Sequence, residues 1–128
     1  MAKLTVVKRD ETPVRDFGNG LTLQILQDSF SGAKHLDMGT VRIPAGKSTP
    51  MHVRIFDEVI YMLRGSGLVQ TEDGDKYELN AGDSVLIPAG TMHAHVNESD
   101  TELEQLYIFA PQAPAEVERS LRDLPIIS

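Results

Sequence analysis

The 128-residue sequence contains no cysteine and no tryptophan, and aromatic residues make up only 5% of it. Without cysteine, the chain cannot form disulfides, zinc–thiolate sites, iron–sulfur clusters or a cysteine nucleophile. Basic residues are also scarce: 12 Lys and Arg stand against 19 Asp and Glu, which gives a net charge of −7. An acidic chain without a basic run is poorly suited to bind nucleic acid or an anionic membrane, so we expect neither as a partner.

Long hydrophobic runs are absent as well, because no apolar stretch approaches the roughly 18 residues that a membrane helix needs. Charged residues come too early in the N-terminal segment 1–11 for the apolar core of a signal peptide. A chain of this length buries roughly two thirds of its unfolded surface, which is enough for a core without covalent cross-links. We therefore expect one soluble domain, residues 1–128, located in the cytoplasm.

Apolar residues mostly alternate with polar ones, and this period of two is typical of β-strands. The alternating segments are short and are separated by turn residues; they cover 21–26, 40–43, 59–63, 68–71, 76–79, 84–87 and 106–109. Asp73-Gly74 lies between two of these segments and gives the strongest hairpin signal in the chain. Many short strands joined by turns at short spacing predict an all-β sandwich or barrel.

One segment has helical rather than strand periodicity. Within residues 114–124, three apolar residues recur at the spacing of one helix face, and Pro114 suits the first helical position. Pro125 ends the segment. We predict a short C-terminal helix here, packed on the outside of a barrel or across a dimer interface. The core of the domain then covers about 35–110, preceded by N-terminal strands within 1–30.

Three of the four histidines lie in two segments that are rich in glycine and proline. The residues at fixed spacings are Gly46, His52, Glu58 and Gly65 in the first segment and Gly82, Pro88, Gly90, His93 and Asn97 in the second. These spacings resemble the two sequence motifs of the cupin superfamily of small single-domain proteins. The first motif has a second histidine where this chain has Arg54, so nine of the ten motif positions match.

The resemblance implies an all-β double-stranded β-helix, a jelly-roll barrel, with the functional site inside it. It also implies that His52, His93 and Glu58 are metal ligands. Two imidazoles and one carboxylate, with further positions open, are typical of non-haem iron sites. The same ligands can hold manganese, nickel, cobalt or zinc, so the expected cofactor is one divalent transition metal of unspecified identity.

Arg54 departs from the family pattern, and an arginine cannot bind a cation. Inside a barrel its guanidinium needs an anionic partner, which makes Arg54 a candidate to bind a carboxylate or phosphate of a substrate. Alternatively, it turns outward or pairs with Glu58 or Asp57. His95 lies two residues after His93 and therefore on the same face of a strand. It is a candidate fourth ligand, a general acid or base, or a residue that orients another ligand.

Several apolar residues are candidates for the wall of a substrate pocket, although each could equally be ordinary core. They are Met38, Met51, Phe56, Ile60, Met62, Met92, Tyr107 and Phe109. Tyr61 has the opposite parity to Glu58 along its strand, so we place it on the other face. His35 precedes the predicted strand 40–43 and is not assigned to the site.

The sequence supports two hypotheses about function. The first is a metal-dependent enzyme with dioxygenase-like, lyase or isomerase activity on a small anionic organic substrate, in which Arg54 and His95 are the catalytic candidates. The alternative is a module that binds an organic acid or a sugar without a metal and without catalysis. In both cases we expect a homodimer, with the N-terminal strand and the apolar residues 125–127 at its interface.

Overall fold

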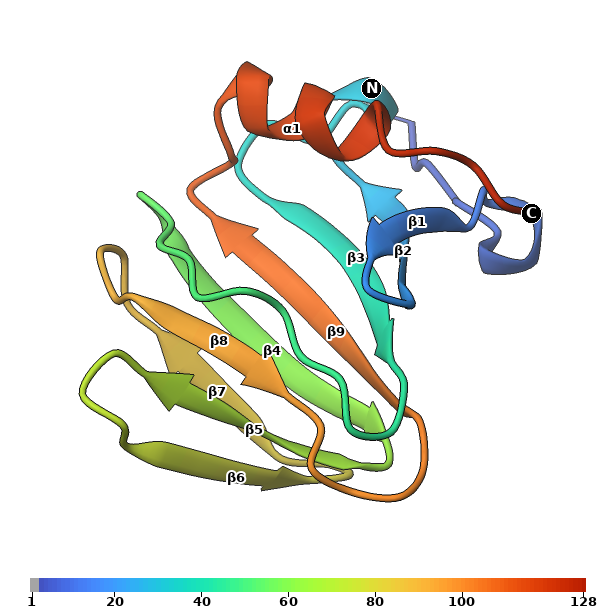
Figure 1. Ribbon diagram of the computed structural model, residues 1–128. Helices are drawn as coiled ribbons and strands as arrows, with labels where there is room; N and C mark the ends of the chain where they lie inside the picture. Colours follow the sequence, from blue (N-terminus) through green and yellow to red (C-terminus); the bar gives the residue numbers. More distant parts are fainter. Residues whose placement is uncertain (1–2) are drawn as a thin grey trace.

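Two antiparallel sheets that face each other form the body of the computed structural model, which describes residues 3–128 (Figure 1). In the large sheet the strand order is β1 (Arg15–Gly18), β2 (Leu21–Gln27), β3 (Asp37–Ile43), β9 (Leu103–Ala110), β4 (Asp57–Arg64) and β7 (Ser84–Ile87). In the small sheet it is β6 (Lys76–Asn80), β5 (Ser66–Thr71) and β8 (His93–Val96). The predicted all-β, double-sheet barrel is confirmed.

Alternation along the strands places one set of side chains in the core between the sheets. In β4, Ile60 and Met62 are fully buried, whereas Tyr61 and Leu63 are each 41% exposed on the outer face. The opposite parity of Tyr61 is therefore as the sequence predicts. The predicted turn at Asp73-Gly74 joins β5 to β6 as an antiparallel hairpin.

The C-terminal helix α1 (Ala115–Arg122) lies across one end of the large sheet (Figure 1). It begins one residue later and ends two residues earlier than the predicted segment 114–124, because Pro114 is extended and acts as the N-cap. Two short 3₁₀ helices, η1 (Arg9–Glu11) and η2 (Ser29–Ser31), complete the helical elements of the described residues. Within residues 3–128, no helix is both long and apolar enough to cross a bilayer.

The C-terminal residues, predicted to lie at a dimer interface, pair with the N-terminal part of the same chain. The C-terminal residues pair with the segment leading into β1, through the Ile127 N–H to Val14 O and the Asp16 N–H to Pro125 O. Residues 125–127 thus have a partner in their own chain, and the homodimer stays a prediction. The strands predicted within 1–30 are β1 and β2; residues 1 and 2 lie outside the described part of the chain.

Helix α1 is held by polar side chains that are buried beneath it. Arg122 donates two hydrogen bonds of 2.8 and 2.9 Å to the Asp28 carboxylate, and Glu118 accepts one from the Ser29 backbone N–H. Asp37, only 4% exposed, accepts the Ala113 N–H at 2.6 Å. Burial, together with the neighbouring Glu118 carboxyl, raises the pKa of Asp37 to about 7.

We expect the Asp37→Asn variant to become more stable than the parent protein as the pH rises. Because the folded-state pKa of about 7 lies above the ordinary 3.8, the folded protein binds more protons between these values. Its stability therefore falls as the pH rises through this window and levels off above it. Asparagine keeps the acceptor for Ala113 and removes the titration. Thermal unfolding measured from pH 4 to pH 8 tests this.

The exposed Asp100 provides a matched control, because Asp100→Asn should give a stability difference that does not change with pH. If the stability difference between Asp37→Asn and the parent also does not change with pH, the pKa of Asp37 is not raised in the folded protein.

Candidate metal centre

Four side chains from separate parts of the chain meet in the space between the two sheets. Glu58 is on β4 of the large sheet, whereas His93 and His95 are on β8 of the small sheet. His52 lies in the irregular segment before β4, which two backbone hydrogen bonds of 2.8 Å join to His93. One potential ligand atom from each residue lies within 4.8 Å of the others, a spacing compatible with a single bound ion.

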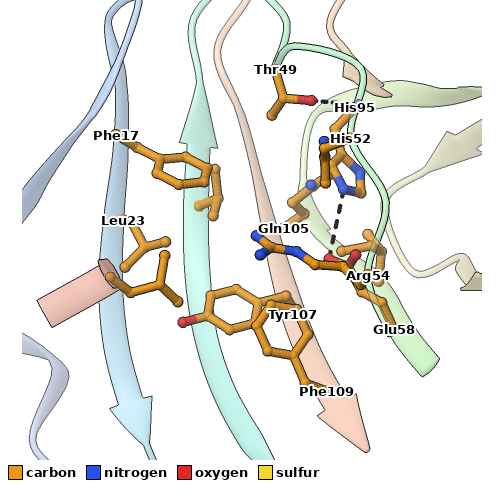
Figure 2. Close-up of a pocket in the computed structure, with 13 residues that line it drawn as sticks. Phe17, Leu23, Thr49, His52, Arg54, Glu58, His95, Gln105, Tyr107 and Phe109 are labelled. Carbon is orange, nitrogen blue, oxygen red and sulfur yellow. Dashed lines mark hydrogen bonds and ion pairs between the residues drawn. The ribbon is translucent and has the colours of Figure 1, made fainter. Parts of the chain in front are cut away.

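The four residues are in direct contact. Glu58 Oε1 lies 3.4 Å from His93 Nε2, and Glu58 Oε2 lies 3.6 Å from His95 Nε2 (Figure 2 draws the latter contact). The ring centroid of His52 lies 4.4 Å from that of His93 and 5.6 Å from that of His95. Glu58, His93 and His95 are buried, and His52 is half-buried.

Backbone carbonyls orient two of the imidazoles. His52 Nδ1 lies 2.8 Å from Pro50 O, and His93 Nδ1 lies 2.8 Å from Thr91 O. These contacts favour a proton on Nδ1 and leave the Nε2 lone pair free to bind a metal. Among residues 3–128, three buried atoms of the cluster have no hydrogen-bond partner: Glu58 Oε1, His93 Nε2 and His95 Nδ1.

The pKa values of His52 and Glu58 are both lowered, whereas that of His93, although burial lowers it, is raised by the facing Glu58 carboxylate and the Thr91 carbonyl. Burial, the other histidines and Arg54 lower the pKa of His52 to about 4. Burial alone would raise the pKa of Glu58, but the facing imidazoles of His93 and His95 outweigh it and hold that pKa well below its usual range. The cluster therefore offers a carboxylate and a neutral imidazole at neutral pH, which are the protonation states that metal ligation requires.

Arg54 enters the same space instead of turning outward. Its side chain extends across the cavity toward Tyr107 and Phe109 (Figure 2), with Cζ 5.4 Å from the Phe109 ring centroid. Asp57, one alternative partner, accepts the Ala89 N–H instead, and Glu58 faces the histidines. Among residues 3–128, no group hydrogen-bonds the buried Arg54 Nε.

Two connected spaces lead to this cluster. The inner cavity has a volume of about 30 Å³, room for about two water molecules. Its walls are Phe17, Leu23, Val41, Thr49, His52, Arg54, Glu58, Ile60, His95, Gln105, Tyr107, Phe109 and Leu121. The outer cleft, of about 440 Å³, is lined by Phe17, Gly18, Asn19, Leu21, Ser48, Thr49, Pro50, His52 and Arg54.

Of the eight apolar residues proposed for the pocket wall, three line the inner cavity: Ile60, Tyr107 and Phe109. Met38 is on the other face of β3 from the lining residue Val41, because the two differ by an odd number of positions. Met62 is fully buried in the core, and Phe56 packs beside Phe109 without reaching the cavity.

The sequence analysis did not predict several of the residues that line the cavity. Gln105 shares its strand parity with Tyr107 and Phe109, so the alternation along β9 could have predicted that it faces the cavity. Phe17 precedes any clear strand pattern, and nothing in the sequence connects it with the histidines.

Asn97 is buried but does not line the cavity; its amide donates to the Ile43 and Thr101 carbonyls, which is a structural role. His35 is exposed and outside the cluster.

Comparison with known proteins identifies the family. Residues 39–109 match the cupin domain model, and the chain belongs to that family. The chain is 35% identical over 78 residues to an uncharacterized protein of Methanocaldococcus jannaschii, a match that covers 60% of this chain and 61% of that protein. The chain therefore spans less than two thirds of the length of that relative.

Solved structures share the fold. The polyketide cyclase RemF from Streptomyces resistomycificus superposes with a TM-score of 0.76 at 24% identity, covering 89% of this chain and 82% of RemF. An RmlC-like cupin from Shewanella frigidimarina gives a TM-score of 0.74 at 24% identity, covering 90% and 96%. At this identity the likeness concerns the fold, which supports many different reactions.

Thr49 connects the segment before β4 to β8 next to His95. Its N–H donates to His95 O, and its hydroxyl accepts the His95 N–H, both at 2.9 Å. Thr49→Val keeps the shape but leaves the buried His95 N–H unpaired. We expect it to lose about 1–3 kcal/mol of unfolding free energy, measured by urea denaturation. Thr49→Ser, which keeps the hydroxyl, should lose clearly less; an equal loss in both variants would contradict this role of the hydrogen bond.

Proposed function

We propose that this protein is a metal-dependent enzyme that acts on a small organic anion. His52, Glu58, His93 and His95 hold one divalent transition metal, and Arg54 binds the anionic group of the substrate. The observation that carries the proposal is the convergence of one potential ligand atom from each of these four residues, all within 4.8 Å of one another. Glu58, His93 and His95 also have buried polar atoms that lack hydrogen-bond partners among residues 3–128. Each such atom costs about 1–3 kcal/mol unless a ligand compensates it.

The donor set fits a transition metal. Imidazole nitrogens suit iron, copper, nickel and zinc, and the added carboxylate is found in non-haem iron sites. When bound, the ion would supply a Lewis acid that polarises an oxygen of the substrate. In the alternative of a metal-free binding module, Glu58 and His93 would pair with each other but the buried His95 Nδ1 would lack a partner among residues 3–128, so we favour the metal.

Arg54 supplies the contact to the substrate. Its guanidinium extends into the inner cavity, and its Nε is buried without a partner among residues 3–128, although a buried cation needs an anion. A planar guanidinium binds a carboxylate through two parallel hydrogen bonds, which also fixes the orientation of the substrate. Arg54 thus places the substrate with one end against the metal ligands.

The finer form of the proposal concerns the reaction. A lyase or isomerase reaction would need only the substrate beside the metal ligands, whereas the dioxygenase-like reaction favoured by the sequence would need dioxygen as well. Oxygen consumption by the metal-loaded protein, measured with candidate organic acids, distinguishes these classes.

We expect the untagged protein, dialysed against a weak chelator, to retain nearly one metal ion per chain. His93→Ala removes a central ligand and should lose most of this metal, as measured by elemental analysis. His35→Ala is the matched control, because His35 is exposed and outside the cluster, and it should retain the metal. A folded parent that binds no iron, manganese, cobalt, nickel or zinc when each is supplied would overturn the metal proposal.

The Arg54→Gln variant should affect the metal and the anion in opposite directions. Removing a positive charge close to the ligands should tighten binding of the metal by about tenfold. It should weaken binding of benzoate by at least about tenfold, because a charge-assisted pair is lost. Calorimetric titration measures both affinities. Arg42→Gln, whose side chain pairs with Glu104 outside the cavity, is the control and should leave benzoate affinity unchanged. Unaltered benzoate binding in Arg54→Gln would contradict the role of Arg54.

A further inference from the structure

The inner cavity and the outer cleft share four of their lining residues. Phe17, Thr49, His52 and Arg54 line both spaces. The smaller space touches Glu58 and His95, and the larger one does not. A molecule that extends from the outer cleft into the inner cavity, toward Glu58 and His95, therefore contacts this shared set of residues.

Phe17 occupies an irregular position in β1. Arg15 pairs with Leu23 and Asp16 with Thr22, but the next pair is Gly18 with Leu21, so Phe17 has no partner on β2. Such a bulge bends the strand and redirects the side chain of the extra residue, and bulges are frequent beside active sites.

Local contacts hold this bulge in place. Gly18 has a φ of +90°, a conformation that favours glycine, and its N–H donates to Asp16 Oδ1 at 2.9 Å. The Phe17 ring then packs against the hydrophobic core while remaining partly exposed, and it points into the space above Tyr107 and Leu23 (Figure 2).

The chemistry of the outer cleft indicates what it could hold. Phe17, Leu21 and Pro50 supply apolar surface, and Arg54 is the only charged side chain besides the titratable His52 in its described lining. Arg54 lines both spaces, whereas Leu21 and Pro50 line the outer cleft alone. This arrangement suits a ligand with an anionic end that faces inward and an apolar body that faces outward.

We infer that the outer cleft is a binding subsite for the apolar body of an organic anion, and that Phe17 determines the size of the group that fits beside Arg54. The inference rests on the proposed function, because it uses the anion bound by Arg54. It adds a substrate class, carboxylates with a ring or branched hydrocarbon body, and a residue that sets specificity without touching the metal.

Affinities for acetate, benzoate and 2-naphthoate, measured by calorimetry on the metal-loaded protein, test the inference. In the parent protein, benzoate should bind at least about tenfold more tightly than acetate, because its ring is buried in the outer cleft. In Phe17→Ala, the affinity ratio of 2-naphthoate to benzoate should rise by about tenfold, since the wall next to Arg54 is removed. Ratios that are the same in Phe17→Ala and in the parent would overturn the role of Phe17.

Two controls make the result unambiguous. Phe30→Ala also removes a partly exposed aromatic ring, but from η2, outside both spaces, and should leave all ratios unchanged. Phe17→Leu preserves most of the packing, so it tests the same position if Phe17→Ala unfolds. We expect it to raise the affinity ratio of 2-naphthoate to benzoate, but by less than Phe17→Ala does. An unchanged ratio in a folded Phe17→Leu, where Phe17→Ala cannot be measured, would also overturn the inference.

A neutral pair of probes separates this inference from the proposed function. Benzyl alcohol and 2-naphthalenemethanol need neither the metal nor the charge of Arg54 to occupy the outer cleft. If their affinity ratio changes in Phe17→Ala while no carboxylate binds the parent, the subsite is supported and the anionic substrate is wrong. If their ratio does not change, the subsite is wrong whatever the carboxylates do.

Discussion

A buried carboxylate facing two imidazoles is the interaction on which the rest of this structure depends. Glu58 is 5% exposed and lies between His93 and His95, and a charge in such a place is tolerated only when paired. Because Glu58 comes from the large sheet and the histidines from the small one, this contact spans the interior of the barrel. The same three residues also have buried polar atoms without partners among residues 3–128, and together with His52 they could hold a metal.

The backbone around the site is arranged to keep these side chains in position. β4 lies between β9 and β7, so Glu58 is on an inner strand of the large sheet with pairing on both sides. His52 has no regular strand of its own, yet its backbone pairs with His93 and its ring is held by Pro50 O. The paired strands and the hydrogen-bonded segment that carries His52 together hold the side chains in position, as metal sites require.

The replacement of a family histidine by Arg54 changes what the barrel can recognise. His95 supplies a third imidazole, so the cluster still has four potential ligands. The guanidinium adds a positive charge inside a chain whose net charge is −7. Under the proposed function, Arg54 and the walls that surround it would give this fold, which supports many reactions, its chemical preference.

The sequence by itself determined the class of fold and most of the candidate centre. Period-two alternation and glycine-rich turns are local properties, and they predicted an all-β fold. The resemblance to the cupin motifs implied that His52, Glu58 and His93 share one site, and strand parity added His95. Only the tertiary structure decided the direction of Arg54 and the walls of the cavities. Met38 faces away from the site because of the register of β3, and Phe17 enters it through a bulge in β1. Register and bulges arise from pairing between strands that are distant in the sequence, so no local pattern could reveal them.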